Sequence, residues 1–164
     1  MTPAIHPLYL LLGANLGDPE QTFLAVCQLV TNNIGPIAAQ SALYETAAWG
    51  VTDQPAFLNQ VLRVDTYLTP ADVLAKTQAI EQQLGRVRAE KWGARTIDID
   101  LLFYGDLILD TPMLTLPHPL LHQRRFTLVP LAELAPNLVH PVLKKTVCAL
   151  LEACPDRGDV IKCS

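Results

Sequence analysis

Residues 96–104 read TIDIDLLFY, a stretch in which acidic and apolar side chains alternate. Successive side chains of a β-strand point to opposite faces, so the odd-numbered residues from Ile97 to Phe103 are predicted to share one face. The even-numbered residues, from Asp98 to Tyr104, then share the other face. On such a strand the carboxylates of Asp98 and Asp100 lie side by side, about 7 Å apart.

The chain upstream of this strand divides into elements with recognisable start and stop signals. Compact apolar runs bounded by glycine or proline predict strands, and a capping residue followed by proline predicts the start of a helix. The predicted elements are a strand over 8–12, a helix from Asp18 to about Asn33, strands over 37–44 and 57–67, and a helix from Thr69 to Gly85. The order strand, helix, strand, strand, helix, strand is typical of a ferredoxin-like βαββαβ core. We therefore expect an α+β fold, an antiparallel sheet with helices packed on it.

The chain downstream of the strand is richer in breaks. Gly105-Asp106 matches a two-residue hairpin turn, which predicts an edge strand over 107–110. Prolines between positions 112 and 141 are expected to break the chain into short pieces, and the pattern over 142–154 predicts a last amphipathic helix. The expected core thus carries an extra C-terminal hairpin and helix, and residues 1–164 are expected to form one domain.

The composition is that of a folded chain. Its 164 residues are 50% hydrophobic, and 12 Lys and Arg against 16 Asp and Glu give a net charge of −4. A chain of about 150 residues can bury about 70% of its unfolded surface around one core, which excludes global disorder. The acidic balance offers no general attraction to a phosphate backbone, so nucleic acid is not an expected partner.

The N-terminus and the cysteines indicate a compartment. Residues 1–17 hold no Lys or Arg and only a short aliphatic run, so neither a secretory signal nor a membrane association is expected. The four cysteines, at positions 27, 148, 154 and 163, lack C-x-x-C spacing, which favours reduced thiols. We therefore expect a cytoplasmic protein.

The paired carboxylates of Asp98 and Asp100 suit a hard cation. Two acids on one face of a strand can bind one cation or bridge two, with waters and substrate oxygens as the remaining ligands. Mg²⁺ fits this donor set best. An ordinary solvated face of an edge strand is the alternative explanation.

Four cations precede this strand within ten residues: Arg86, Arg88, Lys91 and Arg95. The stretch lacks helical periodicity and contains Trp92-Gly93, which predicts a loop. Ordinary surface salt bridges would account for such a run taken alone. Together with the two acids, however, guanidinium groups and a metal site are what a polyphosphate needs. The Walker and kinase glycine loops are absent, and Gly13 and Gly17 are better explained by a strand-to-helix turn.

A third group of aromatic and polar residues suits a flat heterocyclic ligand. Two aromatic rings would stack on its faces, and an amide would form hydrogen bonds with its edge. The group comprises Thr46, Trp49, Phe57, Asn59, Trp92 and Phe126. Packing in the core is the alternative for Phe57 and Phe126. His118 and His122 are a poor zinc pair because Pro119 disfavours a continuous helix between them, and His118, near Arg124, can instead donate to phosphate.

Several of these stretches together resemble the 6-hydroxymethyl-7,8-dihydropterin pyrophosphokinase family. They are GANLGD at 13–18, YET at 44–46 with DQP at 53–55, LGRVR at 84–88, WGARTIDID at 92–100, and PHP at 117–119 with Arg124 and Phe126. The resemblance runs from about Leu8 to Pro141, and the block over 92–100 is its most specific part. It implies an enzyme of folate biosynthesis that moves the diphosphate of ATP onto the hydroxymethyl group of a reduced pterin and releases AMP.

The resemblance also implies roles for individual residues. Asp98 and Asp100 would hold two Mg²⁺ ions, and Arg86 and Arg95 would join them as the catalytic set. The ATP site would comprise Glu81, Arg86, Arg88, Lys91, Trp92, Arg95, Leu101, Thr115, His118 and Arg124. The pterin site would comprise Thr46, Ala47, Trp49, Phe57, Asn59, Trp92, Asp98 and Phe126. ATP and the pterin would be the partners of a monomeric enzyme, with no nucleic acid and no membrane, and mobile loops are expected over 47–55 and 85–95.

The sequence departs from the family pattern at a few positions. Lys91 stands where Arg is common, so a bidentate phosphate contact would become a point-charge contact. Ala47, Ala48 and Ala94 replace common prolines, which should loosen both loops. Phe57 lacks the hydroxyl of the commoner tyrosine.

Two other classes of protein stay open on the residues alone. A non-catalytic ferredoxin-like module would bind a small ligand without Mg²⁺, or RNA through exposed aromatics and a basic surface, which this chain does not clearly offer. A two-metal phosphodiesterase would need more carboxylates than this pattern supplies.

Overall fold

The computed structural model describes residues 4–46, 56–85 and 97–163. Their elements follow the predicted order up to residue 104 and then continue with short pieces. The strands are β1 (His6–Ala14), β2 (Ile37–Gln40), β3 (Tyr44–Thr46), β4 (Phe57–Thr66), β5 (Asp98–Tyr104), β6 (Leu109–Asp110), β7 (Thr115–Leu116) and β8 (Ile161–Lys162). The helices are α1 (Pro19–Asn33), α2 (Pro70–Gln83), α3 (Arg125–Leu134) and α4 (Val147–Glu152), with a 3₁₀ turn, η1, at Leu121–Gln123.

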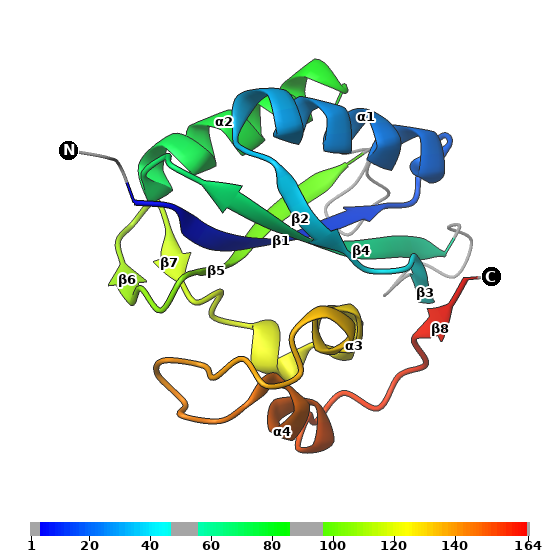
Figure 1. The fold of residues 1–164 in the computed structure, drawn as a ribbon. Helices are drawn as coiled ribbons and strands as arrows, with labels where there is room; N and C mark the ends of the chain where they lie inside the picture. The colour runs from blue at the N-terminus through cyan, green and yellow to red at the C-terminus, as the bar shows by residue number, and fades with distance from the viewer. Residues whose placement is uncertain (1–3, 47–55, 86–96, 164) are drawn as a thin grey trace.

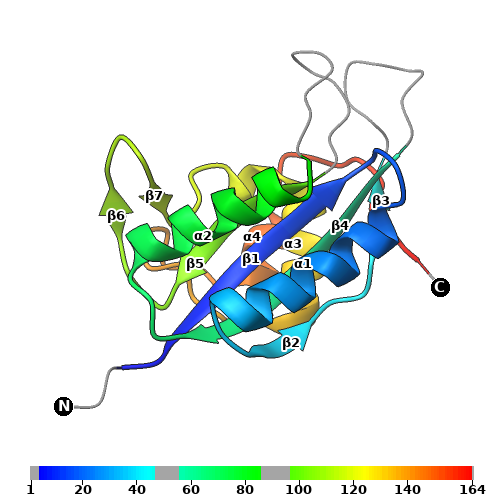
Figure 2. The ribbon, with the colours of Figure 1, turned by 90° about the horizontal axis from the view of Figure 1, so that it is seen from above.

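The main sheet is antiparallel and is covered by helices on both faces. Its strands run in the order β5-β1-β4-β3-β8, and β2 also pairs with β4. Helices α1 and α2 lie side by side over one face, and α3 and α4 lie against the other (Figures 1 and 2). The predicted combination of an antiparallel sheet with packed helices is therefore confirmed, whereas the second helical layer was predicted only as a C-terminal helix.

Both long helices begin at the predicted caps. The Asp18 carboxylate accepts a hydrogen bond from the N–H of Gln21 at 3.2 Å, and the Thr69 hydroxyl accepts one from Asp72 at 3.2 Å. Each cap satisfies an N–H that the first turn of a helix leaves without a partner, and a proline follows each cap. Among the described residues, no helix is both long and apolar enough to cross a membrane.

The alternation of strand β1 creates one apolar core on each face of the sheet. Leu8, Leu10 and Leu12 are fully buried in the core beneath α1 and α2. Tyr9 and Leu11 point the other way, into the core that α3 and α4 complete. Each leucine buried on this scale contributes about 1.5–3 kcal/mol, so β1 stabilises both layers at once.

Strand β5 departs from simple alternation near its end. Tyr9 pairs with Phe103 but the next residue of β1 pairs with Leu101, so Leu102 is the extra residue of a β-bulge. Beyond the bulge the faces exchange: Phe103 packs in the core of α3 and α4, and Tyr104 packs in the core of α1 and α2. The prediction that Leu102 shares a face of the strand with Asp98 and Asp100 is confirmed. The faces predicted for Phe103 and Tyr104 are wrong.

Two predicted strands also need correction. The strand expected over 37–44 is split into β2 and β3, because the Ser41 hydroxyl accepts a hydrogen bond from the N–H of Val61 at 2.9 Å and replaces the regular ladder there. The strand expected over 107–110 shrinks to β6, which pairs with β7 and not with β5. Glycine and turn signals marked the breaks but not the pairing partners.

The helices after residue 112 differ most from the prediction. Helix α3 contains Pro130, although prolines were expected to break this region. Its apolar face, including Leu128 and Leu131, is fully buried, and this packing outweighs the backbone hydrogen bond that Pro130 removes. The last helix is shorter than the predicted 142–154, since α4 begins only after its cap Thr146.

Buried His140 links the loop before α4 to the second core. Its Nδ1 accepts hydrogen bonds from the N–H groups of Val142 and Leu143 at 3.1 and 3.0 Å, and its ring packs edge-on against Phe103. Burial lowers the pKa of His140 below its usual 6.5, and the neighbouring His122 lowers it further. Since a protonated Nδ1 cannot accept these bonds, the loop requires the neutral ring.

This arrangement predicts an acid-sensitive fold. The unfolded chain takes up a proton at His140 near pH 6.5 while the folded chain resists it, so the free energy of unfolding should fall as the pH drops below about 6.5. Urea unfolding at pH 7.5 and 5.5 measures this loss. His140→Gln should be less stable at pH 7.5 but should show a smaller difference between the two pH values, and an unchanged difference would contradict the assignment.

Candidate active site

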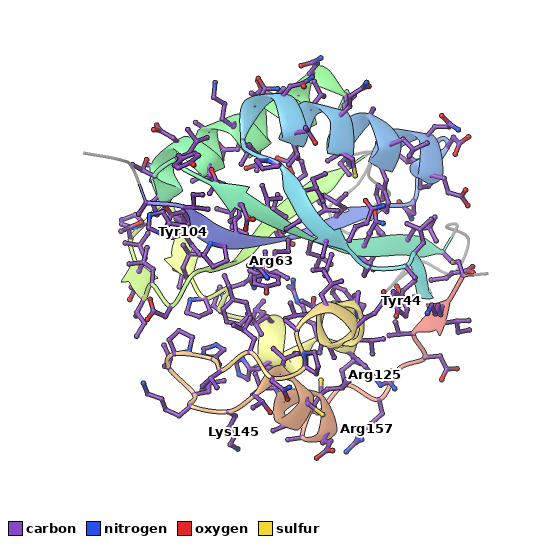
Figure 3. All side chains as sticks on the ribbon, in the orientation of Figure 1. Tyr44, Arg63, Tyr104, Arg125, Lys145 and Arg157 are labelled. Carbon is purple, nitrogen blue, oxygen red and sulfur yellow. The ribbon has the colours of Figure 1, made fainter. Side chains whose placement is uncertain are left out.

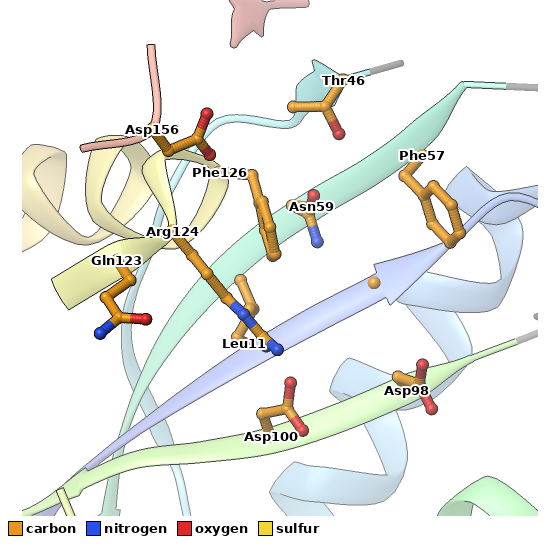
Figure 4. A pocket seen from close by; sticks show the side chains of 11 residues that line it. Leu11, Thr46, Phe57, Asn59, Asp98, Asp100, Gln123, Arg124, Phe126 and Asp156 are labelled. Atoms are coloured by element: carbon orange, nitrogen blue, oxygen red, sulfur yellow. The ribbon is translucent and has the colours of Figure 1, made fainter. Parts of the chain in front are cut away.

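The two acids of β5 lie on the face of the sheet that α1 and α2 do not cover. Asp98 pairs with Gly13 and Asp100 pairs with Leu11 on β1, while Ile99 between them is buried under the helices. Both acids are half-buried and line one cavity (Figure 4). The shared face predicted from the D-x-D spacing is therefore present.

That cavity, which we call the ring cavity, has a volume of about 410 Å³. It collects side chains from strands β1, β3, β4 and β5, from the start of α3 and from the tail after α4. Its lining residues are Leu11, Gly13, Thr46, Phe57, Asn59, Asp98, Asp100, Gln123, Arg124, Phe126 and Asp156.

Two aromatic rings stand on different walls of the ring cavity. Phe57 comes from the start of β4 and Phe126 from the first turn of α3, with Asn59 between them in the view of Figure 4. The Arg124 guanidinium lies 5.7 Å from the centroid of the Phe126 ring. At this distance the cation attracts the face of the ring and helps to fix both side chains.

Asn59 is held in a defined orientation. It is buried on β4, and its Nδ2 donates a hydrogen bond to the carbonyl of Leu12 at 3.2 Å. This bond orients the amide, which presents a donor and an acceptor side by side to the cavity. A buried amide of this kind can read the edge of a heterocycle.

A second cavity, of about 250 Å³, lies on the other side of Asp100, and we call it the hairpin cavity. The segment around β6 and β7 forms one wall. Its lining residues are Leu74, Ile99, Asp100, Leu101, Thr111, Pro112, Met113, Leu114, Thr115, His118 and Pro119. Because Asp100 lines both cavities, the two spaces meet at one of the two paired carboxylates.

His118 carries a neutral ring with a defined tautomer. Its Nδ1 accepts a hydrogen bond from the N–H of Leu120 at 3.1 Å, which leaves the ring proton on Nε2. Burial lowers the pKa of His118 below its usual 6.5, although the Asp100 carboxylate opposes this effect and the Arg124 guanidinium adds to it. At neutral pH the side chain is therefore an uncharged N–H donor.

The structure brings together some of the residues chosen from the sequence and not others. Thr46, Phe57, Asn59, Asp98 and Phe126 of the expected pterin set surround the ring cavity, as does Arg124. Leu101, Thr115 and His118 of the expected ATP set line the hairpin cavity. Glu81 lines neither, because its Oε2 accepts a hydrogen bond from the N–H of Ile99 at 2.8 Å and supports the β5 backbone. Ala47, Trp49, Arg86, Arg88, Lys91, Trp92 and Arg95, and most of both expected loops, lie outside the described residues.

Four residues of the ring cavity were not chosen from the sequence: Leu11, Gly13, Gln123 and Asp156. The prediction that Gly13 belongs to a strand-to-helix turn is wrong, because Gly13 lies inside β1, opposite Asn59. A glycine inside a strand often marks a close approach of a ligand or another chain segment. Asp156 carried no signal, because it lies in a tail whose position depends on long-range contacts.

The donor set fits a hard cation only with help from other molecules. Within residues 4–46, 56–85 and 97–163, no three His, Cys, Asp or Glu side chains gather closely enough to hold a metal ion. The two carboxylates nevertheless offer oxygen ligands on one face of a cavity, as Mg²⁺ prefers, and Mg²⁺ commonly keeps waters and substrate oxygens as its other ligands. Asp98 and Asp100 therefore fit a shared substrate–metal site.

Comparison with known proteins places the chain among pterin enzymes. A model of the 7,8-dihydro-6-hydroxymethylpterin-pyrophosphokinase (HPPK) family matches residues 9–136. The 2-amino-4-hydroxy-6-hydroxymethyldihydropteridine pyrophosphokinase of Aquifex aeolicus is 41% identical over 138 residues, which are 84% of this chain and 86% of the relative. The protein of the same name from Pseudomonas aeruginosa is 43% identical over 155 residues, 94% of this chain and 95% of the relative.

Solved structures agree on the fold. The wild-type HPPK-DHPS of Plasmodium falciparum with pteroate matches with a TM-score of 0.77 at 18% sequence identity. The match covers 93% of this chain but only 43% of that chain, so the protein spans less than half the length of this solved relative. At this identity the likeness concerns the fold alone.

The close approach of Gly13 to Asn59 generates a testable prediction. A Cβ at position 13 would lie 2.9 Å from Asn59 Nδ2, so Gly13→Ala should force the amide off Leu12 and lower the free energy of unfolding by about 1–3 kcal/mol. Asn59→Ala removes the obstructing amide. In urea unfolding, the double variant should therefore lose about 1 kcal/mol less free energy of unfolding than the two single variants lose together. Additive effects would refute this contact.

Proposed function

The chain belongs to the 7,8-dihydro-6-hydroxymethylpterin-pyrophosphokinase family, whose members transfer diphosphate from ATP to 6-hydroxymethyl-7,8-dihydropterin in folate synthesis, and we propose that its two cavities divide the substrates. The pterin would occupy the ring cavity, and the adenine end of ATP the hairpin cavity. The products are the pterin diphosphate and AMP. The observation that carries this assignment is Asp100, which lines both cavities.

The ring cavity suits a pterin in size and chemistry. Its volume of about 410 Å³ lies in the usual range for small-molecule sites, about 300–1,000 Å³. Phe57 and Phe126 would stack on the faces of the bicyclic ring, and Thr46 and the oriented amide of Asn59 would bind its polar edge. Phe57 has no hydroxyl group, so it would contribute to pterin binding by stacking alone.

The hairpin cavity suits the nucleotide. Leu74, Leu101 and Met113 offer apolar surface to a base, and Thr115 and His118 offer hydrogen-bond donors near Asp100. The Nε2–H of His118 would donate to a phosphate oxygen without competing for a proton at neutral pH. Glu81 would act indirectly, by holding the β5 backbone at Ile99.

Asp98 and Asp100 would hold Mg²⁺, with two ions expected along the triphosphate. Bound there, Mg²⁺ neutralises phosphate charge and stabilises the negative charge that develops on the leaving group. The chain's own part is to keep both carboxylates on one face of a regular strand, opposite Gly13 and Leu11. Neither carboxylate is required as a nucleophile. The hydroxymethyl oxygen of the pterin would bond to the β-phosphorus of ATP as the bond from this phosphorus to the α,β-bridging oxygen breaks, so that AMP leaves and the hydroxyl proton passes to solvent.

The residues outside the described ranges complete the proposal. Arg86 and Arg95 would contact the transferring phosphates, and Arg88, Lys91 and Trp92 would contribute to the ATP site. Ala47, Trp49 and Trp92 would close the pterin site. Thr46, Phe57 and Asp98 each lie within two residues of these segments, and all three line the ring cavity. Closure by the flanking segments would exclude water from the reacting groups.

We extend the proposal to the domain organisation, the compartment and the oligomeric state. The strand order, with α1 and α2 on one face, supports a ferredoxin-like βαββαβ core within one domain, extended by residues 105–163. All four cysteines, which lie within the described ranges, are free thiols, in keeping with a reducing, cytoplasmic compartment. A monomer would suffice, because both cavities are lined by one chain.

Loss of either paired carboxylate should remove turnover and leave the fold. Asp98→Ala and Asp100→Ala are each expected to lower the rate of AMP release on the order of 10³-fold or more, since Mg²⁺ loses a ligand. AMP is measured with purified protein, ATP, Mg²⁺ and the pterin, and circular dichroism checks the fold. Asp106→Ala, an exposed acid just after β5, is the matched control and should be fully active.

Near-normal AMP release from either carboxylate variant would overturn the metal assignment. Ligand binding without AMP release in the wild type would indicate a sensor.

A guanidinium at the transferring phosphates should act mainly in the transition state. Arg95→Ala is expected to lower kcat about 10²-fold while the dissociation constant of the pterin changes little. Steady-state kinetics and direct binding measure the two quantities, with Arg157→Ala, an exposed arginine of the tail, as control. Equal weakening of pterin binding and turnover would contradict this role.

A further inference from the structure

Helix α3 begins without a cap from its own sequence. Arg124 occupies the N-cap position and its side chain makes no capping hydrogen bond. The N–H of Arg125 donates instead to Oδ2 of Asp156 at 3.1 Å, across 31 residues of sequence. The negative carboxylate also suits the positive end of the helix dipole. The tail after α4 therefore supplies the cap that this helix lacks.

The residues on either side of this hydrogen bond belong to the ring cavity. Arg124 and Phe126 flank Arg125 and both line the cavity, and Asp156 itself lines it beside them (Figure 4). The second oxygen of Asp156, Oδ1, accepts a hydrogen bond from the N–H of Gly158 at 2.9 Å, which fixes the carboxylate within the tail. One carboxylate thus holds the backbone between the ring of Phe126 and the guanidinium of Arg124.

The tail that carries Asp156 is attached to the protein at both ends. Cys154 is buried in the core of α3 and α4. At the other end, β8 pairs with β3, and the N–H of Cys163 donates to the carbonyl of Leu43 at 2.8 Å. Strand β3 ends at Thr46, another residue of the ring cavity. Figure 1 shows the tail running from α4 to the edge of the sheet beside β3, so it connects two walls of the cavity.

We propose that Asp156 is a positioning residue of the pterin pocket: it caps α3 from the tail and so sets the place of Phe126 and Arg124. This inference rests on the proposed function, because it assigns the ring cavity to the pterin. The hairpin cavity shares neither Asp156 nor the first turn of α3. Arg124 alone, of the described residues in the expected ATP set, adjoins the capped start of α3. Loss of the cap should therefore weaken binding of the pterin more than binding of the nucleotide.

Binding measurements on three single variants give the first test of the inference. Asp156→Ala should raise the dissociation constant of 6-hydroxymethyl-7,8-dihydropterin about tenfold, the weight of one helix cap. The dissociation constant of a non-hydrolysable ATP analogue with Mg²⁺ should rise less, by about threefold at most, since Arg124 is the one described residue of the expected ATP set beside the cap. Asp156→Asn keeps one acceptor oxygen of the two that Asp156 uses and should recover part of the affinity. Asp159→Ala, an exposed acid of the same tail, is the matched control and should behave as the wild type.

Arg125→Pro removes the donor side of the same hydrogen bond. Proline suits the first position of a helix, and the extended backbone of Arg124, with φ −122° and ψ 107°, suits the residue before a proline. In an Arg125→Pro background, Asp156→Ala should raise the pterin dissociation constant by less than about twofold, since the bond is already absent. Circular dichroism at the binding temperature confirms that each variant is folded. If Asp156→Ala is not folded, Arg125→Pro alone removes the same hydrogen bond and should raise the pterin dissociation constant about tenfold, and an unchanged constant would overturn the role.

The outcomes separate the inference from the function on which it rests. If the wild type binds the pterin and releases AMP but Asp156→Ala binds the pterin equally well, the positioning role is wrong and the proposed function stands. Equal loss of pterin and ATP-analogue affinity would also overturn the role, because it indicates a general defect. If the wild type binds no pterin, the proposed function fails and the inference falls with it.

Discussion

Strand β1 pairs with β4 on one side and β5 on the other, and the rest of the molecule depends on the register of these two pairings. Gly13 lies opposite Asn59 on β4 and opposite Asp98 on β5. The amide and the carboxylate therefore stand on either side of a residue without a side chain, on the same face of the sheet. If the register of either pairing shifted by one residue, the Asn59 amide or the Asp98 carboxylate would point into the apolar core under α1 and α2.

The cavity over this face exists because α3 is held at both ends. Near its C-terminal end, the Glu133 carboxylate accepts hydrogen bonds from the N–H of Ala42 and from the hydroxyl of Tyr44. Tyr44, labelled in Figure 3, is the first residue of β3. At its start, Asp156 accepts from the N–H of Arg125. Both contacts join segments that are far apart in the chain. The helix thus leaves an open space above the sheet. Residues at the start of α3 and residues of β4 line the walls of this space.

Local patterns were enough to predict the parts that short-range physics controls. The caps Asp18 and Thr69, the alternation of β5 as far as Leu102, and the shared face of Asp98 and Asp100 all follow from the conformational preferences of a few neighbouring residues. The family resemblance added the reaction and nominated most of the ring-cavity residues. Their roles remain predictions, and the cationic segment before Thr96 lies outside the described residues.

The sequence by itself determined the order of strands and helices as far as Tyr104 and the shared face of the two acids, because these depend on side-chain type and spacing. The kind of reaction came from the family resemblance. Tertiary structure alone decided the bulge at Leu102, the survival of α3 around Pro130, the hydrogen bond between Glu81 and the N–H of Ile99, and the entry of Asp156 into the cavity. Each of these depends on a partner far away in the chain, since burial and distant hydrogen bonds outweigh the local preference there.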